Sequence, residues 1–254
     1  MSWFFFEGRR VWYEESGAGT PLLLLHGNAA SSNMFFELAE RYRRQFRVVL
    51  LDFLGNGRSQ RLSRWPADLW FDEAQQAIAL LRERGYEKVD LIGCSGGALA
   101  AVNVALEAPA LVGRVIADSF EGERPLPAFT ESVREQRARS KREEAARQFY
   151  FYMHGADWEQ VVDRDTDAIL RHSRQIGAFF HRPLCGLEAE LLLTGSREDE
   201  FTAALSPDYL QRAYGALLQK VGHGRMHLFD HGAHPAMLSN PEAFYQLSME
   251  FLQG

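Results

Sequence analysis

The sequence predicts an α/β fold in which an eight-stranded, mostly parallel sheet is flanked by helices and carries a small helical cap. Short leucine-rich or β-branched runs alternate with longer helical patterns, as expected when crossover helices connect parallel strands. With 254 residues, the chain is long enough for one large domain. Its composition, 46% hydrophobic and 24% charged, is that of an ordinary globular protein.

The strands are placed by their apolar runs. The first two runs, residues 3–6 and 11–14, predict an opening antiparallel pair. The later runs are typical of buried strands, and they cover residues 20–26, 46–52, 88–93, 114–118, 188–195 and 225–230. Eight strands follow from this pattern.

Helices are indicated between several of these runs. Apolar side chains recur at helical spacing between residues 70 and 81, and Gly85 follows as a stop signal. Near the end of the chain, Asn240 and Pro241 predict the N-cap and first turn of a last helix.

One long segment interrupts the alternation. Residues 121–186 contain no convincing strand, and their pattern is helical and highly charged. We therefore predict a helical cap at 121–186, inserted after the sixth strand of a core formed by 1–120 and 187–254. The mixed charges between 121 and 147 predict a solvated helix face. The aromatic run at 149–153 packs either at the mouth of an active site or between cap and core.

Charge and cysteine content exclude several kinds of partner. A net charge of -6 and a pI of about 5.8 give no overall attraction to nucleic acid. The two cysteines, Cys94 and Cys185, share no metal-ligand spacing with histidines, so we expect no metal and no other cofactor. No stretch has the order of a signal peptide or the length of a membrane span. We expect a cytoplasmic monomer or homodimer that acts on a small molecule.

The motif most specific for chemistry is a serine between glycines. The run Gly93-Cys94-Ser95-Gly96-Gly97 follows an apolar strand and precedes a helix of small residues. A serine at such a strand-to-helix turn is held in a strained conformation that presents its hydroxyl above the sheet. A phosphate-binding turn is the alternative, but the run has neither G-x-G-x-x-G spacing nor a Walker lysine. Ser95 is therefore predicted to be a nucleophile.

A second turn supplies candidate hydrogen-bond donors. His26-Gly27-Asn28 follows the apolar strand at 20–26. An acyl-transfer intermediate needs donors aimed at its oxyanion, and main-chain N–H groups at strand ends can provide them. We predict that the N–H groups of Asn28 and Gly96 form this oxyanion hole, whereas His26 shapes the turn.

Four motifs in order resemble the α/β-hydrolase superfamily. They are His26-Gly27, the turn from Asp52 to Ser59, the elbow at Ser95, and Gly232-Ala233-His234-Pro235 near the end. The resemblance covers essentially the whole chain. It implies an eight-stranded sheet, a helical cap after the sixth strand, and a triad in the order serine, acid, histidine.

The resemblance also suggests the partners of Ser95. His234 lies between the last strand and the last helix, where the family has its base, and His231 is its nearest competitor. Asp199 follows the strand at 188–195, at a position that resembles the family acid. Asp118, at the end of the sixth strand, is the alternative acid.

The expected activity is that of a serine hydrolase. It would cleave a carboxylic ester or a related acyl bond of a small molecule through an acyl-enzyme on Ser95. The same triad can also serve a carbon-carbon bond (diketone) hydrolase or a lactonase. A further alternative is a non-catalytic ligand-binding member of the fold.

Overall fold

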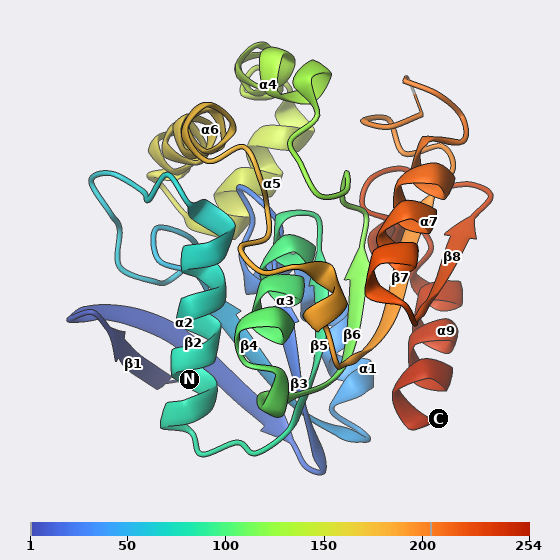
Figure 1. Cartoon of the computed structure of the whole chain (residues 1–254). Helices are drawn as coiled ribbons and strands as arrows, with labels where there is room; N and C mark the ends of the chain where they lie inside the picture. Colours follow the sequence, from blue (N-terminus) through green and yellow to red (C-terminus); the bar gives the residue numbers. More distant parts are fainter. Residues whose placement is uncertain (1, 204) are drawn as a thin grey trace.

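The computed structural model describes residues 2–203 and 205–254, which form one mixed sheet and its helices (Figure 1). The eight strands lie in the order β1-β2-β4-β3-β5-β6-β7-β8. β2 runs antiparallel to β1 and to β4, and all the other neighbouring pairs are parallel. This agrees with the predicted eight-stranded, mostly parallel sheet. The strands are β1 (Ser2–Phe6), β2 (Arg9–Gly17), β3 (Thr20–Leu25), β4 (Phe46–Asp52), β5 (Val89–Cys94), β6 (Val112–Asp118), β7 (Glu190–Ser196) and β8 (Arg225–Phe229).

Helices cover both faces of the sheet. In Figure 1, α2, α3 and α7 lie in front of the strands, and α1 and α9 lie behind them. The helices of these two layers, with the short α8, are α1 (Phe36–Tyr42), α2 (Leu69–Glu83), α3 (Gly96–Glu107), α7 (Tyr209–Val221), α8 (Ala236–Ser239) and α9 (Pro241–Gln253). Three short 3-10 helices, at Ser32–Phe35, Pro109–Leu111 and Leu184–Gly186, complete the core.

The leucine run of β3 shows why the central strands are apolar at every position. Leu23 and Leu25 belong to the core cluster shared with α2 and α3, whereas Leu22 and Leu24 belong to the cluster shared with α1 and α9. Side chains alternate between the two faces of a strand, so a strand covered on both faces must be apolar throughout. This burial fixes β3 and β5 in the middle of the sheet.

A helical insertion lies between β6 and β7, over the carboxyl ends of the parallel strands (Figure 1). It consists of α4 (Pro127–Ser140), α5 (Glu144–His154) and α6 (Trp158–Gln175). Arg61, in the loop after β4, ties this insertion to the core. Its guanidinium donates to Asp157 Oδ2 at 2.8 Å and to the main-chain oxygens of His154 and Gly57, each at 2.8 Å.

The last helix begins at Pro241, and Asn240 occupies its N-cap position, as predicted. The Asn240 side chain itself makes no capping hydrogen bond to α9. Its Nδ2 donates instead to the main-chain oxygen of His231 at 3.0 Å and to Ser196 Oγ at 3.3 Å. The amide therefore ties the loop after β8 to β7.

The crossing of α3 over β3 yields a stability prediction. A Cβ added at Gly97 would lie 2.1 Å from the main-chain oxygen of Leu25, and a backbone atom cannot move aside at low cost. We expect Gly97→Ala to lower the free energy of unfolding by about 2 kcal/mol. Chemical denaturation measured by circular dichroism checks this value.

Gly215→Ala is the matched control. Gly215 lies inside α7, where an added Cβ would meet nothing within 4 Å. Because alanine favours helix more than glycine does, this variant should gain about 0.5–1 kcal/mol. Equal effects of the two substitutions would contradict the close approach of α3 to β3.

Candidate active site

Ser95 lies at the sharp turn between β5 and α3. Its φ is 54° and its ψ is -124°, a region that non-glycine residues rarely adopt. A Cβ on Gly93 would lie 2.1 Å from the main-chain oxygen of Gly97, so the chain can reverse here only without that side chain. Ser95 N–H donates to the main-chain oxygen of Asp118 at 2.7 Å, which fixes the turn on β6.

The structure brings Ser95, His234 and Asp199 into one hydrogen-bonded row. Ser95 Oγ lies 2.9 Å from His234 Nε2, and His234 Nδ1 lies 2.7 Å from Asp199 Oδ2. The three residues come from the turns that follow β5, β8 and β7. Because the carboxyl ends of parallel strands share one edge of the sheet, residues far apart in the sequence meet there.

The hydrogen bonds define the tautomer of His234. An ionised carboxylate only accepts hydrogen bonds, so His234 Nδ1–H must donate to Asp199. His234 Nε2 then carries a lone pair and accepts the Ser95 hydroxyl. Asp199 is 1% exposed, and its other oxygen accepts the N–H of Phe201 at 3.0 Å. The row is thus ordered for proton transfer from Ser95.

Neighbouring charges tune the basicity of His234. Burial lowers its pKa, but the hydrogen bond and charge of Asp199, with the charges of Asp118 and Glu200, outweigh burial and raise the pKa above 6.5. Glu200 also accepts the main-chain N–H of His234 at 2.9 Å. The imidazolium formed during proton transfer would therefore be stabilised.

Asp118, the alternative acid, lies beside this row and bonds to other groups. Its Oδ1 accepts Thr194 Oγ1 at 2.7 Å, and its Oδ2 accepts the N–H of Met237 at 3.1 Å. Burial raises the pKa of Asp118 to about 6. Asp118 thus holds the start of α8, just after His234, while Asp199 makes the hydrogen bond to the imidazole.

The predicted oxyanion donors adjoin each other beside Ser95. A Cβ added to Gly96 would lie 2.1 Å from Asn28 Oδ1. Within the described part of the chain, neither the Asn28 N–H nor the Gly96 N–H has a main-chain acceptor. The Asn28 side chain is engaged elsewhere: its Nδ2 donates to Asp165 Oδ1 at 2.9 Å, and its Oδ1 accepts Trp70 Nε1 at 3.1 Å.

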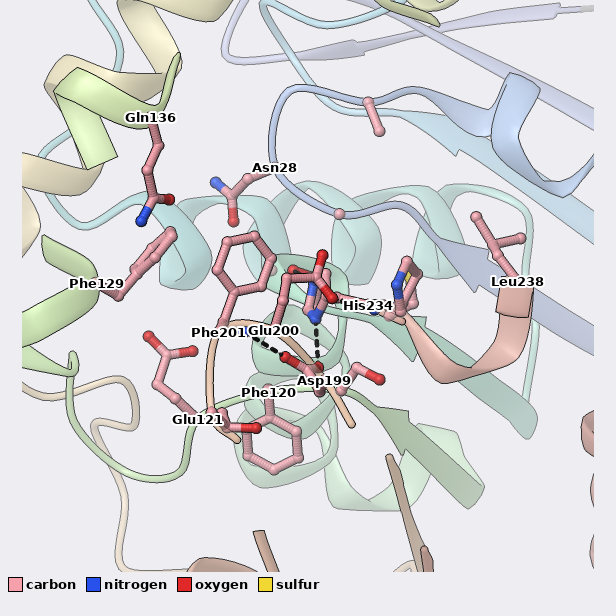
Figure 2. Close-up of a pocket in the computed structure, with 18 of the residues that line it drawn as sticks. Asn28, Phe120, Glu121, Phe129, Gln136, Asp199, Glu200, Phe201, His234 and Leu238 are labelled. Carbon is pink, nitrogen blue, oxygen red and sulfur yellow. Dashed lines mark hydrogen bonds and ion pairs between the residues drawn. The ribbon is translucent and has the colours of Figure 1, made fainter. Parts of the chain in front are cut away.

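A cavity of about 500 Å³ opens above Ser95 and extends under the helical insertion (Figure 2). Its walls are largely apolar. Figure 2 shows Phe120, Phe129 and Phe201 around the space next to His234. The ring of Phe201 packs edge-on against the His234 imidazole, with 4.8 Å between the ring centroids. Such a cavity suits a small organic molecule.

The aromatic run at 149–153 has both of the roles that were left open. Phe149 and Tyr150 line the cavity. Met153 is buried against the core, where Ser31 Oγ lies 3.4 Å from its sulfur. Phe151 and Tyr152 are exposed.

The prediction that the charged segment at 121–147 is a solvated face is wrong for two residues. Glu121 and Arg137 both line the cavity. Burial raises the pKa of Glu121 to about 7. Charge patterning along the chain could not separate these two residues from exposed neighbours such as Arg134, because only the packing of the insertion turns them inward.

Among the hydrogen bonds of the described residues, neither His231 nor His26 bonds to Ser95. The His231 side chain is 85% exposed and pairs with Glu198 at 3.1 Å. His26 is buried, accepts the N–H of Phe53 at its Nε2 and donates from Nδ1 to the main-chain oxygen of Gly27. His26 therefore shapes the turn that precedes Asn28.

Over residues 2–203 and 205–254, no group of three His, Cys, Asp or Glu side chains is arranged to hold a metal ion. None of the helices described for the chain is both long and apolar enough to cross a membrane.

The arrangement around His234 can be tested without any substrate. We expect its imidazole to titrate above pH 6.5 in NMR spectra. In Asp199→Asn the midpoint should fall by about one unit or more, because the opposite charge is lost and burial remains. Asp118→Asn should cause a smaller fall, since that charge acts without a hydrogen bond to the ring.

Asp230→Asn serves as the control for these titrations. Asp230 is exposed and pairs with Arg197 on the surface. A midpoint that stays the same in Asp199→Asn, or that falls equally in Asp230→Asn, would contradict the assignment of Asp199 as the partner of His234.

Several known proteins are similar to this chain. The human serine hydrolase BPHL is 25% identical to this chain over 256 residues, which cover 97% of this chain and 84% of the relative. A carboxylesterase from Nitrososphaera gargenis superposes with a TM-score of 0.78 at 15% identity, covering 99% of this chain and 98% of the other. A meta-cleavage product hydrolase from Pseudomonas fluorescens gives a TM-score of 0.76 at 21% identity, covering 100% and 97%.

At these identities the two solved structures show the fold alone. Family membership rests on a sequence profile, described as the Alpha/beta hydrolase family, that matches residues 22–247. That match covers most of the chain and includes Ser95, Asp199 and His234. The chain therefore belongs to the alpha/beta hydrolase family.

Proposed function

We propose that this protein is a serine hydrolase that cleaves carboxylic esters or related acyl bonds of small molecules, with Ser95, His234 and Asp199 as its catalytic triad. The observation that carries the proposal is the row of hydrogen bonds from Ser95 to Asp199, which opens directly on the cavity. The carboxylesterase and serine hydrolase among the similar proteins support the same class of reaction.

The first half of the reaction forms an acyl-enzyme. Ser95 Oγ attacks the carbonyl carbon of the substrate while its proton passes to His234 Nε2. The negative charge that develops on the carbonyl oxygen is stabilised by the N–H groups of Asn28 and Gly96. His234 then gives its proton to the departing alcohol, and the acyl group remains on Ser95.

The second half regenerates the enzyme. A water molecule takes the place of the alcohol, loses a proton to His234 Nε2 and attacks the acyl carbon. Collapse of the tetrahedral intermediate releases the carboxylic acid, and Ser95 recovers its proton from His234. In both halves Asp199 keeps the imidazole in the tautomer that can accept a proton at Nε2.

The identity of the nucleophile can be tested by covalent labelling. A fluorophosphonate probe should label the wild-type protein at Ser95, because the activated hydroxyl attacks phosphorus as it would attack a carbonyl. Hydrolysis of 4-nitrophenyl butyrate should fall by about four orders of magnitude in Ser95→Ala and in His234→Ala. Mass spectrometry and absorbance assays measure the two effects.

Ser63→Ala is the control, since Ser63 is an exposed serine in the loop after β4. This variant should be labelled by the probe and should hydrolyse 4-nitrophenyl butyrate like the wild type. Folded protein that takes up no probe, or that hydrolyses a diketone but no ester, would overturn the proposed ester chemistry. Tight binding of an ester with no turnover would instead favour a ligand-binding member of the fold.

The pH dependence provides a separate test. Only neutral His234 can accept the Ser95 proton, and the pKa of His234 is raised above 6.5. The value of kcat/KM for a neutral ester should therefore fall as the pH drops through a midpoint above 6.5. Asp118→Asn should move this midpoint to lower pH, because one negative charge that raises the His234 pKa is removed. An acidic limb centred well below 6.5 in the wild type would contradict the assigned base.

A further inference from the structure

The charges in the cavity are unevenly distributed. Among the described residues that line it, Arg137 on α4 is the single lysine or arginine. The carboxylates of Asp199 and Glu200 lie at the other end, near His234, and Glu121 lines the cavity below Phe129 in the view of Figure 2. The cavity therefore has an acidic end at the triad and a cationic wall on the cap.

The Arg137 guanidinium is held in place by two contacts that leave some of its N–H donors without a partner among them. Its Nη1 donates to Tyr150 Oη at 2.8 Å, and its Nη2 lies 3.5 Å from Asp165 Oδ2. A guanidinium has five N–H donors, so donors remain for a ligand. The side chain is 18% exposed, and Arg137 lines the cavity.

Asp165 forms a long ion pair with this cation. The carboxylate of Asp165 also accepts Asn28 Nδ2 at 2.9 Å and the N–H of Ala29 at 3.2 Å, both through Oδ1. Its contact with Arg137 is the longest of the three. Asp165 is therefore shared between the oxyanion loop and the cap, and the bonds described for Arg137 involve one donor on Nη1 and one on Nη2.

The neighbours of Arg137 on α4 are also polar. Gln136 and Ser140 line the same wall of the cavity. Figure 2 shows Gln136 on the side of the cavity away from His234. Phe129 and Leu126, at the start of the helix, line the space between this wall and the acidic end with apolar surface. This order of surfaces fits a molecule with an apolar middle.

We propose that Arg137 forms a subsite for a carboxylate on the acyl part of the substrate, at the end remote from the scissile bond. The inference rests on the proposed hydrolase function and names its substrate class: monoesters of aliphatic dicarboxylic acids. The planar guanidinium can bind a carboxylate through two parallel hydrogen bonds. The carboxylate of Glu200, which accepts the N–H of His234, repels the free carboxylate from the triad, so the substrate enters with its ester toward Ser95.

Two esters of equal chain length test the subsite. The mono-4-nitrophenyl ester of adipic acid carries the remote carboxylate, and 4-nitrophenyl hexanoate lacks it. The wild type should prefer the adipate ester in kcat/KM. Arg137→Gln should reduce that preference by about 10- to 100-fold, chiefly through KM, because a charge-assisted hydrogen bond is lost. Arg137→Lys should keep part of it.

Arg134→Gln is the matched control on the same helix. Arg134 lies on the exposed side of α4, where it pairs with Asp167. This variant should keep the preference for the adipate ester. Equal kcat/KM of the wild type for the hexanoate and the adipate ester would overturn the subsite. An equal loss of kcat/KM for both esters in a folded Arg137→Gln variant would do the same.

A binding measurement separates this inference from the proposed reaction. Monomethyl adipate should bind to Ser95→Ala in a calorimeter, and binding should weaken about 10-fold or more when Arg137→Gln is added. If binding depends on Arg137 but the wild type turns over no ester, the subsite stands and the hydrolase proposal fails. If esters are hydrolysed but neither binding nor kinetics depends on Arg137, the subsite alone fails.

If Arg137→Gln does not fold, the wild type still provides a test. Adipate should inhibit hydrolysis of 4-nitrophenyl hexanoate, and its neutral analogue adipamide should inhibit at least 10-fold more weakly. Equal inhibition by the two compounds would overturn the subsite.

Discussion

The active-site geometry depends on how closely the backbone of α3 approaches β3 and β5. At Gly93 and Gly97 there is no room for a side chain between these elements. The chain can therefore turn sharply from β5 into α3, with a single residue at the apex of the turn. Ser95 occupies that residue and carries the strain of a positive φ. The burial of the central strands on both faces holds the turn rigidly, and the hydroxyl is presented to His234 without any rearrangement.

The cap and the oxyanion loop are joined by one buried carboxylate. Asp165 on α6 accepts hydrogen bonds from the side chain of Asn28 and the main chain of Ala29, and it also faces Arg137 on α4. A buried carboxylate is stable only when it is paired or well hydrogen-bonded. The loop that holds one proposed oxyanion donor, Asn28, therefore depends on the packing of helices that come more than a hundred residues later in the chain.

Local sequence predicted the strands, the elbow at Ser95 and the candidate Asn28, because each is an apolar strand or the turn that follows one. The choice of Asp199 and His234 came from the resemblance to the α/β-hydrolases. Local sequence could not separate Asp199 from Asp118. Both end neighbouring strands, β7 and β6, and only the path of the loop after β8 decides which carboxylate the imidazole meets. Arg137 and Asp165 were not singled out, since a charged residue in a helix gives no sign of which face becomes buried.

The two acids have complementary roles that follow from their surroundings. Asp199 is bonded to the imidazole itself, where its charge stabilises the protonated base. Asp118 lies beneath the next turn and, with Ser119, accepts the N–H groups of Met237 and Ala236. It therefore positions the loop that carries His234 and contributes charge from a distance. A second carboxylate beside the proposed triad is thus explained by the need to hold a short loop in place, because an imidazole displaced by even one ångström would lose its hydrogen bond to Ser95.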